Sequence, residues 1–152
     1  MIDKISFNFS KDTSEIYPAP SAPSTSGNSE KIIGEWLKQH NAKKRSEIVI
    51  STKICGFSDE ITWCRKGGKK AKESANAVEG TRLTAAQITD AVNRQLKRLG
   101  TDYIDLLQFN WPDRYVPLYS APEYNYALER EDAASFRSQL EAIDALVKAG
   151  KV

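Results

Sequence analysis

The most constraining feature of this chain is a helical pattern that lies between two short apolar segments. Residues 85–99 place one stripe of side chains at helical spacing, consisting of Ile88, Ala91, Val92, Gln95, Leu96 and Leu99. The segments EIVISTKI (47–54) and YIDLLQFN (103–110) flank this helix. Both are short and rich in apolar or β-branched residues, as buried strands are. The order strand, helix, strand predicts parallel strands that are covered by helices.

Signals at both ends delimit the central helix. Thr84 and Gln87 form a capping box, in which the threonine side chain accepts a hydrogen bond from an unpaired backbone N–H. Lys97 and Arg98 fall in the last turn, where positive charge is favourable. Gly100 can adopt the left-handed conformation that ends a helix.

The same alternation extends towards the N-terminus. Residues 28–41 show helical spacing, and Asn28 or Ser29 can cap this helix while Glu30 suits the positive end of its dipole. The segment KISFNFS (4–10) precedes it and is interpreted as a first strand. The chain is therefore assigned to the α/β class.

Loops and one more helix complete the pattern. Residues 18–29 hold three of the six prolines, and the polar segment 55–83 is long for a loop in a compact domain, which is typical of functional or disordered segments. A third loop, 112–130, leads to a helix over 135–150. Its predicted core face comprises Phe136, Leu140, Ile143, Leu146 and Val147.

Composition sets limits on class and partners. The chain has 152 residues, enough for one domain, and its 40% apolar and 28% charged content is normal for a soluble globular protein. The net charge of +2 gives no indication of nucleic acid binding, and the basic run at 65–72 is interpreted as a solvated loop. No stretch approaches the roughly 18 apolar residues of a membrane span. We expect neither a nucleic-acid nor a membrane partner.

The two cysteines, Cys55 and Cys64, form a poor disulfide framework. The single histidine, His40, is far from both in sequence, so a metal site is not expected. Reduced thiols in a cytoplasmic protein are the simplest interpretation.

Polar residues gather at the predicted strand ends. Asp12 and Tyr17 follow the first strand, Lys53 ends the second and Asn110 ends the third. In α/β proteins of this kind, active-site residues gather at the carboxyl ends of the strands. Taken singly, Asp12 and Lys53 would be surface charges, Tyr17 a loop aromatic and Asn110 a cap for backbone groups. Their shared placement predicts a catalytic site.

A phenol, an ammonium and a carboxylate together have a plain chemical use. An isolated tyrosine has a pKa near ~10, and a nearby ammonium lowers that pKa. A carboxylate that binds the lysine keeps it charged and fixed. The product is a general acid that can protonate a carbonyl oxygen while a hydride reaches the carbon. A fourth group that donates to the carbonyl would orient the substrate.

Several segments, in order, resemble the aldo-keto reductases, which are NADP(H)-dependent carbonyl reductases on a (β/α)8 barrel. The chain is most similar to members with HWPDR after the fourth strand. The resemblance runs from about residue 5 to residue 152. The segments are DTSEIYP, GNSEKIIGEWLK, VISTKI, LKRLGTDYIDLLQFNWPDR and LEAIDALVKAGKV.

The resemblance implies roles for individual residues. Asp12, Tyr17 and Lys53 match the catalytic residues of the family, and Asn110 stands where the family usually has histidine. An asparagine amide can donate to a carbonyl but cannot titrate near neutrality. If this side chain relays a proton, the substitution would cost the ~10²–10⁴-fold that is typical of general acid–base catalysis. Some members, such as potassium-channel β subunits, carry asparagine here.

Two aromatic residues, Trp63 and Trp111, match positions that help wall the active site in the family and would contact the substrate, an aldehyde or ketone. Without the resemblance, both would be interpreted as packing residues.

A complete barrel of this kind needs typically ~250 residues and eight strand–helix units. The chain resembles the second to fourth units only. We therefore expect residues 1–152 to form a single incomplete aldo-keto reductase domain, a partial (β/α)8 TIM barrel. The family's main nicotinamide- and phosphate-binding segments lie outside this part, and no G-x-G-x-x-G motif replaces them, so no cofactor-binding residue is assigned.

Three hypotheses follow for function. The first is a segment of an NADP(H)-dependent carbonyl reductase whose activity is impaired by truncation and by Asn110. The second is a non-catalytic half-barrel that self-associates through open sheet edges, which are prone to pairing. The third is a truncated product without a function of its own.

Overall fold

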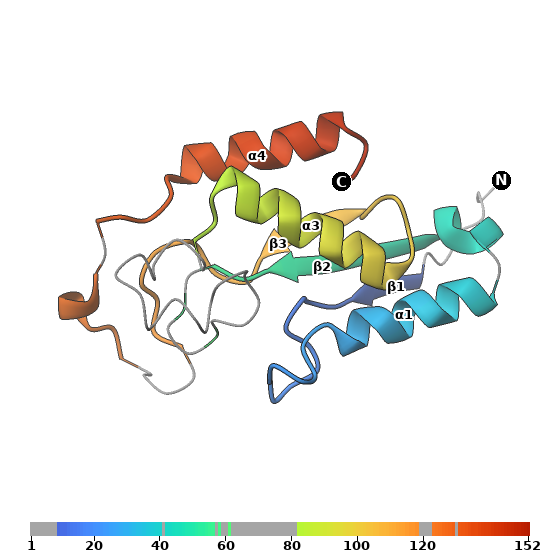
Figure 1. The fold of residues 1–152 in the computed structure, drawn as a ribbon, viewed down its shortest axis with the longest axis horizontal. Helices are drawn as coiled ribbons and strands as arrows, with labels where there is room; N and C mark the ends of the chain where they lie inside the picture. The colour runs from blue at the N-terminus through green and yellow to red at the C-terminus, as the bar shows by residue number, and fades with distance from the viewer. Residues whose placement is uncertain are drawn as a thin grey trace, which may run out of the picture.

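The computed structural model describes residues 9–40, 42–56, 58, 61, 82–118, 123–129 and 131–152. Its strands and α-helices alternate along the chain (Figure 1). They are β1 (Phe9–Asp12), α1 (Asn28–Gln39), β2 (Ile48–Ile54), α3 (Ala85–Leu99), β3 (Leu106–Phe109) and α4 (Phe136–Lys148). Two short 3₁₀ helices, η1 (Ala42–Glu47) and η2 (Tyr126–Leu128), lie in the connections.

The three strands form one parallel sheet in the order β1-β2-β3. Asp12 lies opposite Ser51, and Ile54 lies opposite Phe109, so the carboxyl ends of all three strands meet at one edge. The sheet is open, and helices cover one of its faces (Figure 1). The predicted α/β class and the partial barrel are confirmed.

Strand boundaries differ from the predicted ones. Residues 1–8 lie outside the described part, and β1 extends to Asp12, so this carboxylate ends the strand instead of following it. β3 begins at Leu106, later than the predicted start at residue 103. The Asp105 carboxylate accepts from the backbone N–H of Ile50 at 2.8 Å and from Arg45 at 2.6 Å. The backbone N–H of Asp105 also donates to Ile50 O at 3.2 Å, so both the main chain and the side chain of Asp105 bind Ile50 just before the strand begins.

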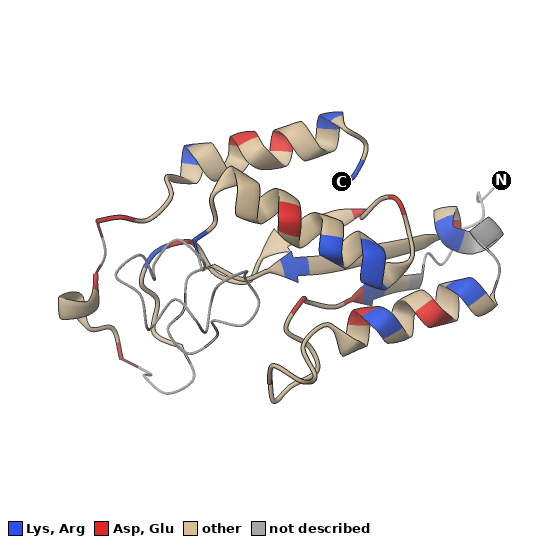
Figure 2. Cartoon of the chain, viewed as in Figure 1, with Lys and Arg blue, Asp and Glu red and all other residues tan. Residues whose placement is uncertain are grey.

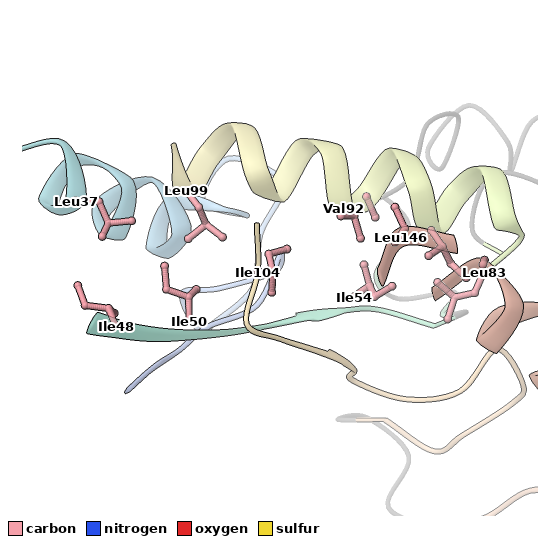
Figure 3. Packing of buried hydrophobic residues seen from close by; sticks show 12 residues of the cluster. Leu37, Ile48, Ile50, Ile54, Leu83, Val92, Leu99, Ile104 and Leu146 are labelled. Carbon is pink, nitrogen blue, oxygen red and sulfur yellow. The ribbon is translucent and has the colours of Figure 1, made fainter. Parts of the chain in front are cut away.

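Alternation along β2 builds the core. Ile48, Ile50 and Ile54 point to the helices and are almost completely buried against α3 and its neighbours (Figure 3). Burial of each such side chain contributes roughly 1.5–3 kcal/mol. The intervening residues, Ser51 and Lys53, therefore face the opposite side of the sheet, which is the side that would be the interior of a barrel.

The ends of α3 are as predicted. Thr84 accepts a hydrogen bond from the backbone of Gln87 at 3.3 Å, and Gly100 has φ 64°. The predicted stripe is buried, with Leu96 partly so. α1 crosses α3 closely at Gly34, where a Cβ atom would collide with the carbonyl oxygen of Arg98.

The predicted N-terminal cap of α1 is wrong. Gly27, with φ 79°, occupies the cap position and offers no side-chain hydrogen bond, while Asn28 begins the helix. Glu30 does lie in the first turn, but it is fully buried and does not face solvent. Its carboxylate accepts hydrogen bonds from Thr52 of β2 and Arg98 of α3, so it links α1 to both elements.

The predicted core face of α4 is only partly correct. Leu146 is buried and Ile143 is partly buried, whereas three members of the predicted stripe are about half exposed or more, namely Phe136, Leu140 and Val147. The buried side of α4 consists of Gln139, Ala142 and Leu146. α4 lies alongside α3 (Figure 1), and its buried Ala142 and Leu146 join the core cluster that also contains Ile54 of β2.

Candidate active site

A tight turn after β1 wraps around the end of β2. The backbone N–H of Thr13 donates to Ser51 O at 2.9 Å, and that of Glu15 donates to Lys53 O at 3.2 Å. The N–H of Tyr17 then closes the turn on Ser14 O at 3.1 Å. These bonds fix Tyr17 beside the strand that carries Lys53.

Lys53 is bound by the end of β1. Its Nζ lies 2.5 Å from Asp12 Oδ2 and donates to the carbonyl oxygen of Thr13 at 2.9 Å. The Lys53 side chain is 16% exposed, but that of Asp12 is 58% exposed. Ion pairs with an exposed member contribute only about 0–1 kcal/mol to stability, and this one holds the ammonium at the end of β1.

The electrostatics of Asp12 follow from this contact. The hydrogen bond from Lys53 holds the pKa of the Asp12 carboxyl below its ordinary value of 3.8, with a smaller contribution from Ser51. Partial burial acts in the opposite direction but does not prevail. Asp12 is therefore a carboxylate at neutral pH, as a partner for an ammonium must be.

Tyr17 lies over the same ammonium. The Lys53 Nζ is 5.3 Å from the centroid of the Tyr17 ring, so the ammonium lies close to the aromatic ring. Tyr17 is half-buried, and it packs against a small apolar cluster of Ile16, Cys55, Ile61 and Trp111. Within the described part of the chain, no hydrogen bond to Tyr17 Oη is present, which leaves the phenol able to donate to a ligand.

Asn110 directly follows β3 and continues its pairing. Its backbone N–H donates to Ile54 O at 2.8 Å. Its side-chain Nδ2 lies 2.7 Å from Ser14 Oγ and 3.3 Å from Cys55 Sγ. The predicted residue is therefore tied to the turn after β1 and to the end of β2.

Trp111 is buried in the apolar cluster beside Tyr17. Gly56 permits this placement, because a Cβ atom there would lie 2.5 Å from the carbonyl oxygen of Trp111. The other predicted wall residue, Trp63, and the second cysteine, Cys64, lie outside the described residues.

The four predicted catalytic residues thus come to one edge of the sheet. Asp12 and Lys53 touch, Tyr17 stacks over Lys53, and Asn110 joins the group through Ser14. This arrangement can donate a proton from a phenol beside a fixed positive charge.

Three residues that touch this group were missed in the sequence. Ser14 and Cys55 contact Asn110, and Gln95 of α3 donates to Lys53 O at 2.9 Å. The sequence carried a signal for Gln95, since it is a polar residue within an otherwise apolar stripe. Ser14 and Cys55 gave no such signal, because their role depends on which strand ends meet.

Other surfaces of the described residues offer less chemistry. A cleft of about 1320 Å³ lies between α1 and the end of α3, lined in part by Lys38, Lys97 and Tyr103, and it contains none of the four residues. Figure 2 shows acidic and basic residues interspersed along the helices in this view. Over the described ranges, no cluster of three metal-ligating side chains is present. No helix described there is long and apolar enough to cross a membrane.

The model of the aldo/keto reductase family matches residues 5–152. The chain belongs to this family. Among curated relatives, it is 33% identical to Protein tas of Escherichia coli over 144 residues, which cover 93% of this chain and 36% of that protein. An aldo-keto reductase of Babesia bovis is 34% identical over 70% of this chain and 35% of its own length.

Two further matches agree with the family. The NADH-specific methylglyoxal reductase of Escherichia coli is 36% identical over 63% of this chain and 26% of its own length. The crystal structure of a thermostable aldo-keto reductase with the inhibitor epalrestat superposes with a TM-score of 0.53. It shares 22% identity over 91% of this chain and 32% of its own, which supports the fold. The chain spans about a third of the length of the first curated relatives.

Proposed function

We propose that these residues are the second to fourth strand–helix units of an NADP(H)-dependent reductase that converts an aldehyde or ketone to an alcohol. The observation that carries this proposal is the contact of Lys53 with Asp12 beneath the ring of Tyr17. The Tyr17 hydroxyl forms no hydrogen bond to a described residue, and its ring lies beside a fixed ammonium. Such a phenol is suited to protonating a carbonyl oxygen. Family membership supports the same chemistry.

Each residue has a distinct task in this proposal. Tyr17 donates the proton to the carbonyl oxygen. Lys53 stabilises the negative charge that then remains on the phenolate, because a charge held in place needs no reorganisation during the reaction. Asp12 holds Lys53 and compensates its charge. The three groups therefore act on one proton and one oxygen.

Asn110 has a different task. Ser14 holds one of its amide hydrogens in a short bond, while the second meets only a sulfur, which is a weak acceptor. A substrate carbonyl can displace the sulfur and take this second hydrogen, so Asn110 would orient the substrate. It cannot relay a proton as the histidine of the family could. We therefore expect a reductase that is slower than members with histidine.

The residues at this edge fit the reacting end of a nicotinamide cofactor. The carboxamide of such a cofactor carries N–H donors, and Asn110 Oδ1 accepts no hydrogen bond from the residues the structure describes. The exposed Asp12 carboxylate is a second acceptor at the same edge of the sheet. When bound, NADP(H) would supply the hydride. Its phosphates are assigned to no residue of this chain, in which no G-x-G-x-x-G motif occurs.

The surroundings of the site support two smaller proposals. Trp111, and Trp63 from the segment outside the described residues, would wall the substrate. A cytoplasmic location is the second of these proposals, because Cys55 and Cys64 form a poor disulfide framework.

One observation favours a second candidate function. The exposed apolar residues of α4, Phe136, Leu140 and Val147, form a face that another chain could cover. A non-catalytic half-barrel that self-associates would use such a face. Sedimentation of the purified chain distinguishes the two, because this candidate requires a discrete oligomer and a monomer contradicts it.

Replacement of Tyr17 tests the main proposal. In the full-length protein, Tyr17→Phe should lower the rate of carbonyl reduction by roughly 10²-fold or more, since it removes the acid and keeps the ring. The rate is followed by loss of NADPH or NADH absorbance with a panel of carbonyls. Methylglyoxal belongs in the panel because one relative is named for its reduction.

Tyr103→Phe is a matched control for this experiment. Tyr103 stacks on Arg45, with its ring centroid 3.8 Å from the guanidinium carbon, and lines none of the proposed site. It should leave the rate unchanged, and cofactor fluorescence should show that Tyr17→Phe still binds NADPH. A Tyr17→Phe rate within about threefold of the unaltered protein would rule out this assignment.

A further inference from the structure

Ser14 occupies the point where the three strand ends meet. It is fully buried, and its carbonyl closes the turn that carries Tyr17. Its Oγ lies 2.7 Å from Asn110 Nδ2 and 3.4 Å from Lys53 O. One small side chain thus contacts groups from both neighbouring strand ends.

The direction of these hydrogen bonds follows from the partners. Lys53 O is an acceptor only, so the Ser14 hydroxyl hydrogen can be directed to it. The lone pairs of Ser14 Oγ are then available for the Asn110 amide, which donates at the short distance. Gln95 and the Glu15 N–H also donate to Lys53 O. These bonds fix the carbonyl to which the Ser14 hydroxyl donates.

We propose that Ser14 is the positioning residue for Asn110. It holds one amide hydrogen and so sets the direction in which the second hydrogen points. Without it, Cys55 Sγ, at 3.3 Å, is the remaining partner for Nδ2 among the described residues, and it would hold the amide only weakly. This inference rests on the proposed function, because the direction of that second hydrogen matters for a bound carbonyl.

A double-mutant cycle tests the inference in the full-length protein. If Ser14 acts through Asn110, Ser14→Ala should lower kcat/KM for a carbonyl substrate by about tenfold, within the range of couplings between bonded neighbours. The same substitution should have no further effect in the Asn110→Ala background. Equal factors in both backgrounds would overturn the proposal.

Ser135→Ala separates positioning from loss of stability. Ser135 caps α4 with its hydroxyl, far along the chain from the site, so its loss should lower the melting temperature and leave kcat/KM unchanged. If Ser135→Ala lowered kcat/KM as much as Ser14→Ala, the effect of Ser14 would be structural and the proposal would fail.

A readout that does not depend on turnover completes the test. In ¹⁵N-labelled protein, the side-chain amide signals of Asn110 are identified by their loss in Asn110→Ala. Ser14→Ala should shift them and accelerate their exchange with water, and unchanged signals would overturn the inference. If the unaltered protein reduces no carbonyl, the proposed function fails, while these signals still decide whether Ser14 holds Asn110.

Discussion

Arg98 of α3 donates from Nε to the buried carboxylate of Glu30 on α1 at 2.5 Å. The other side of this carboxylate accepts from Thr52 of β2 at 2.7 Å, and Thr52 in turn accepts from Gln95 at 3.2 Å. Because Gln95 also donates to the carbonyl of Lys53, the ion pair lies directly behind the strand that carries the proposed catalytic lysine. The two helices and the site thus share one set of hydrogen bonds.

Removal of Glu30 should destabilise the fold strongly. Glu30→Ala leaves Arg98 without its charge partner, and breaking a buried pair in this way costs about 3–5 kcal/mol. Urea unfolding measures the loss. Asp144→Ala is the control, because it breaks the exposed pair with Lys148 and should change the unfolding midpoint little. Equal losses of unfolding free energy in both variants would show that the Glu30–Arg98 pair stabilises the fold no more than an exposed pair does.

The charge of Glu30 should make stability depend on pH. Burial raises the pKa of Glu30 above its ordinary value of 4.5, and it outweighs the lowering by Arg98 and Thr52. The folded state therefore binds the Glu30 proton more tightly than the unfolded state does. The resulting contribution to stability is complete below pH 4.5 and is lost as the pH rises through the raised pKa of the folded state. Relative to Glu30→Gln, the unaltered protein should lose unfolding free energy over that interval. A constant difference would contradict this.

Asp12 should behave in the opposite sense. Lys53 lowers its pKa in the folded state, so its contribution is present above 3.8 and is lost as pH falls through the lowered value. An NMR titration of the Asp12 carboxyl carbon should give a midpoint below 3.8. In Lys53→Met, which keeps the stem without the charge, the midpoint should rise. A midpoint that the substitution does not move would refute the coupling.

Gly34→Ala should destabilise the packing of α1 on α3. Alanine favours a helix by about 1 kcal/mol over glycine, but its Cβ would lie 2.9 Å from Leu99 O and closer still to Arg98 O. Overpacking of this kind costs typically 1–3 kcal/mol, so the melting temperature should fall. Glu35→Ala, on the next and exposed position, is the control. A higher melting temperature for Gly34→Ala would mean that the gain in helix propensity exceeds the cost of the clash with α3.

The class and the strand edge could be predicted because they depend on local pattern. The apolar run around Ile50 and the caps at Thr84 and Gly100 each act within a few residues, so they are visible in the sequence. The placement of Asp12, Tyr17, Lys53 and Asn110 at one edge then follows from parallel strands. Their catalytic roles remain a prediction.

The contacts that hold these residues could not be predicted from pattern. Glu30 suited a helix dipole in the sequence, but its partners, Thr52 and Arg98, are 22 and 68 residues away. The bond between Ser14 and Asn110 spans 96 residues. The exposed side of α4 could not be predicted for a similar reason. A helical stripe shows that a face is apolar, but not which neighbouring element will cover it.

Strand β2 contributes to both the core and the proposed site through alternate residues. Ile50, Thr52 and Ile54 face the helices, and Ser51 and Lys53 face the site. A substitution at one of these positions therefore impairs either the core or the chemistry. A one-residue insertion or deletion within the strand would exchange the two sets and bring an isoleucine to the site and the lysine into the core. This segment can thus tolerate changes in the identity of its residues far more readily than a change in their number.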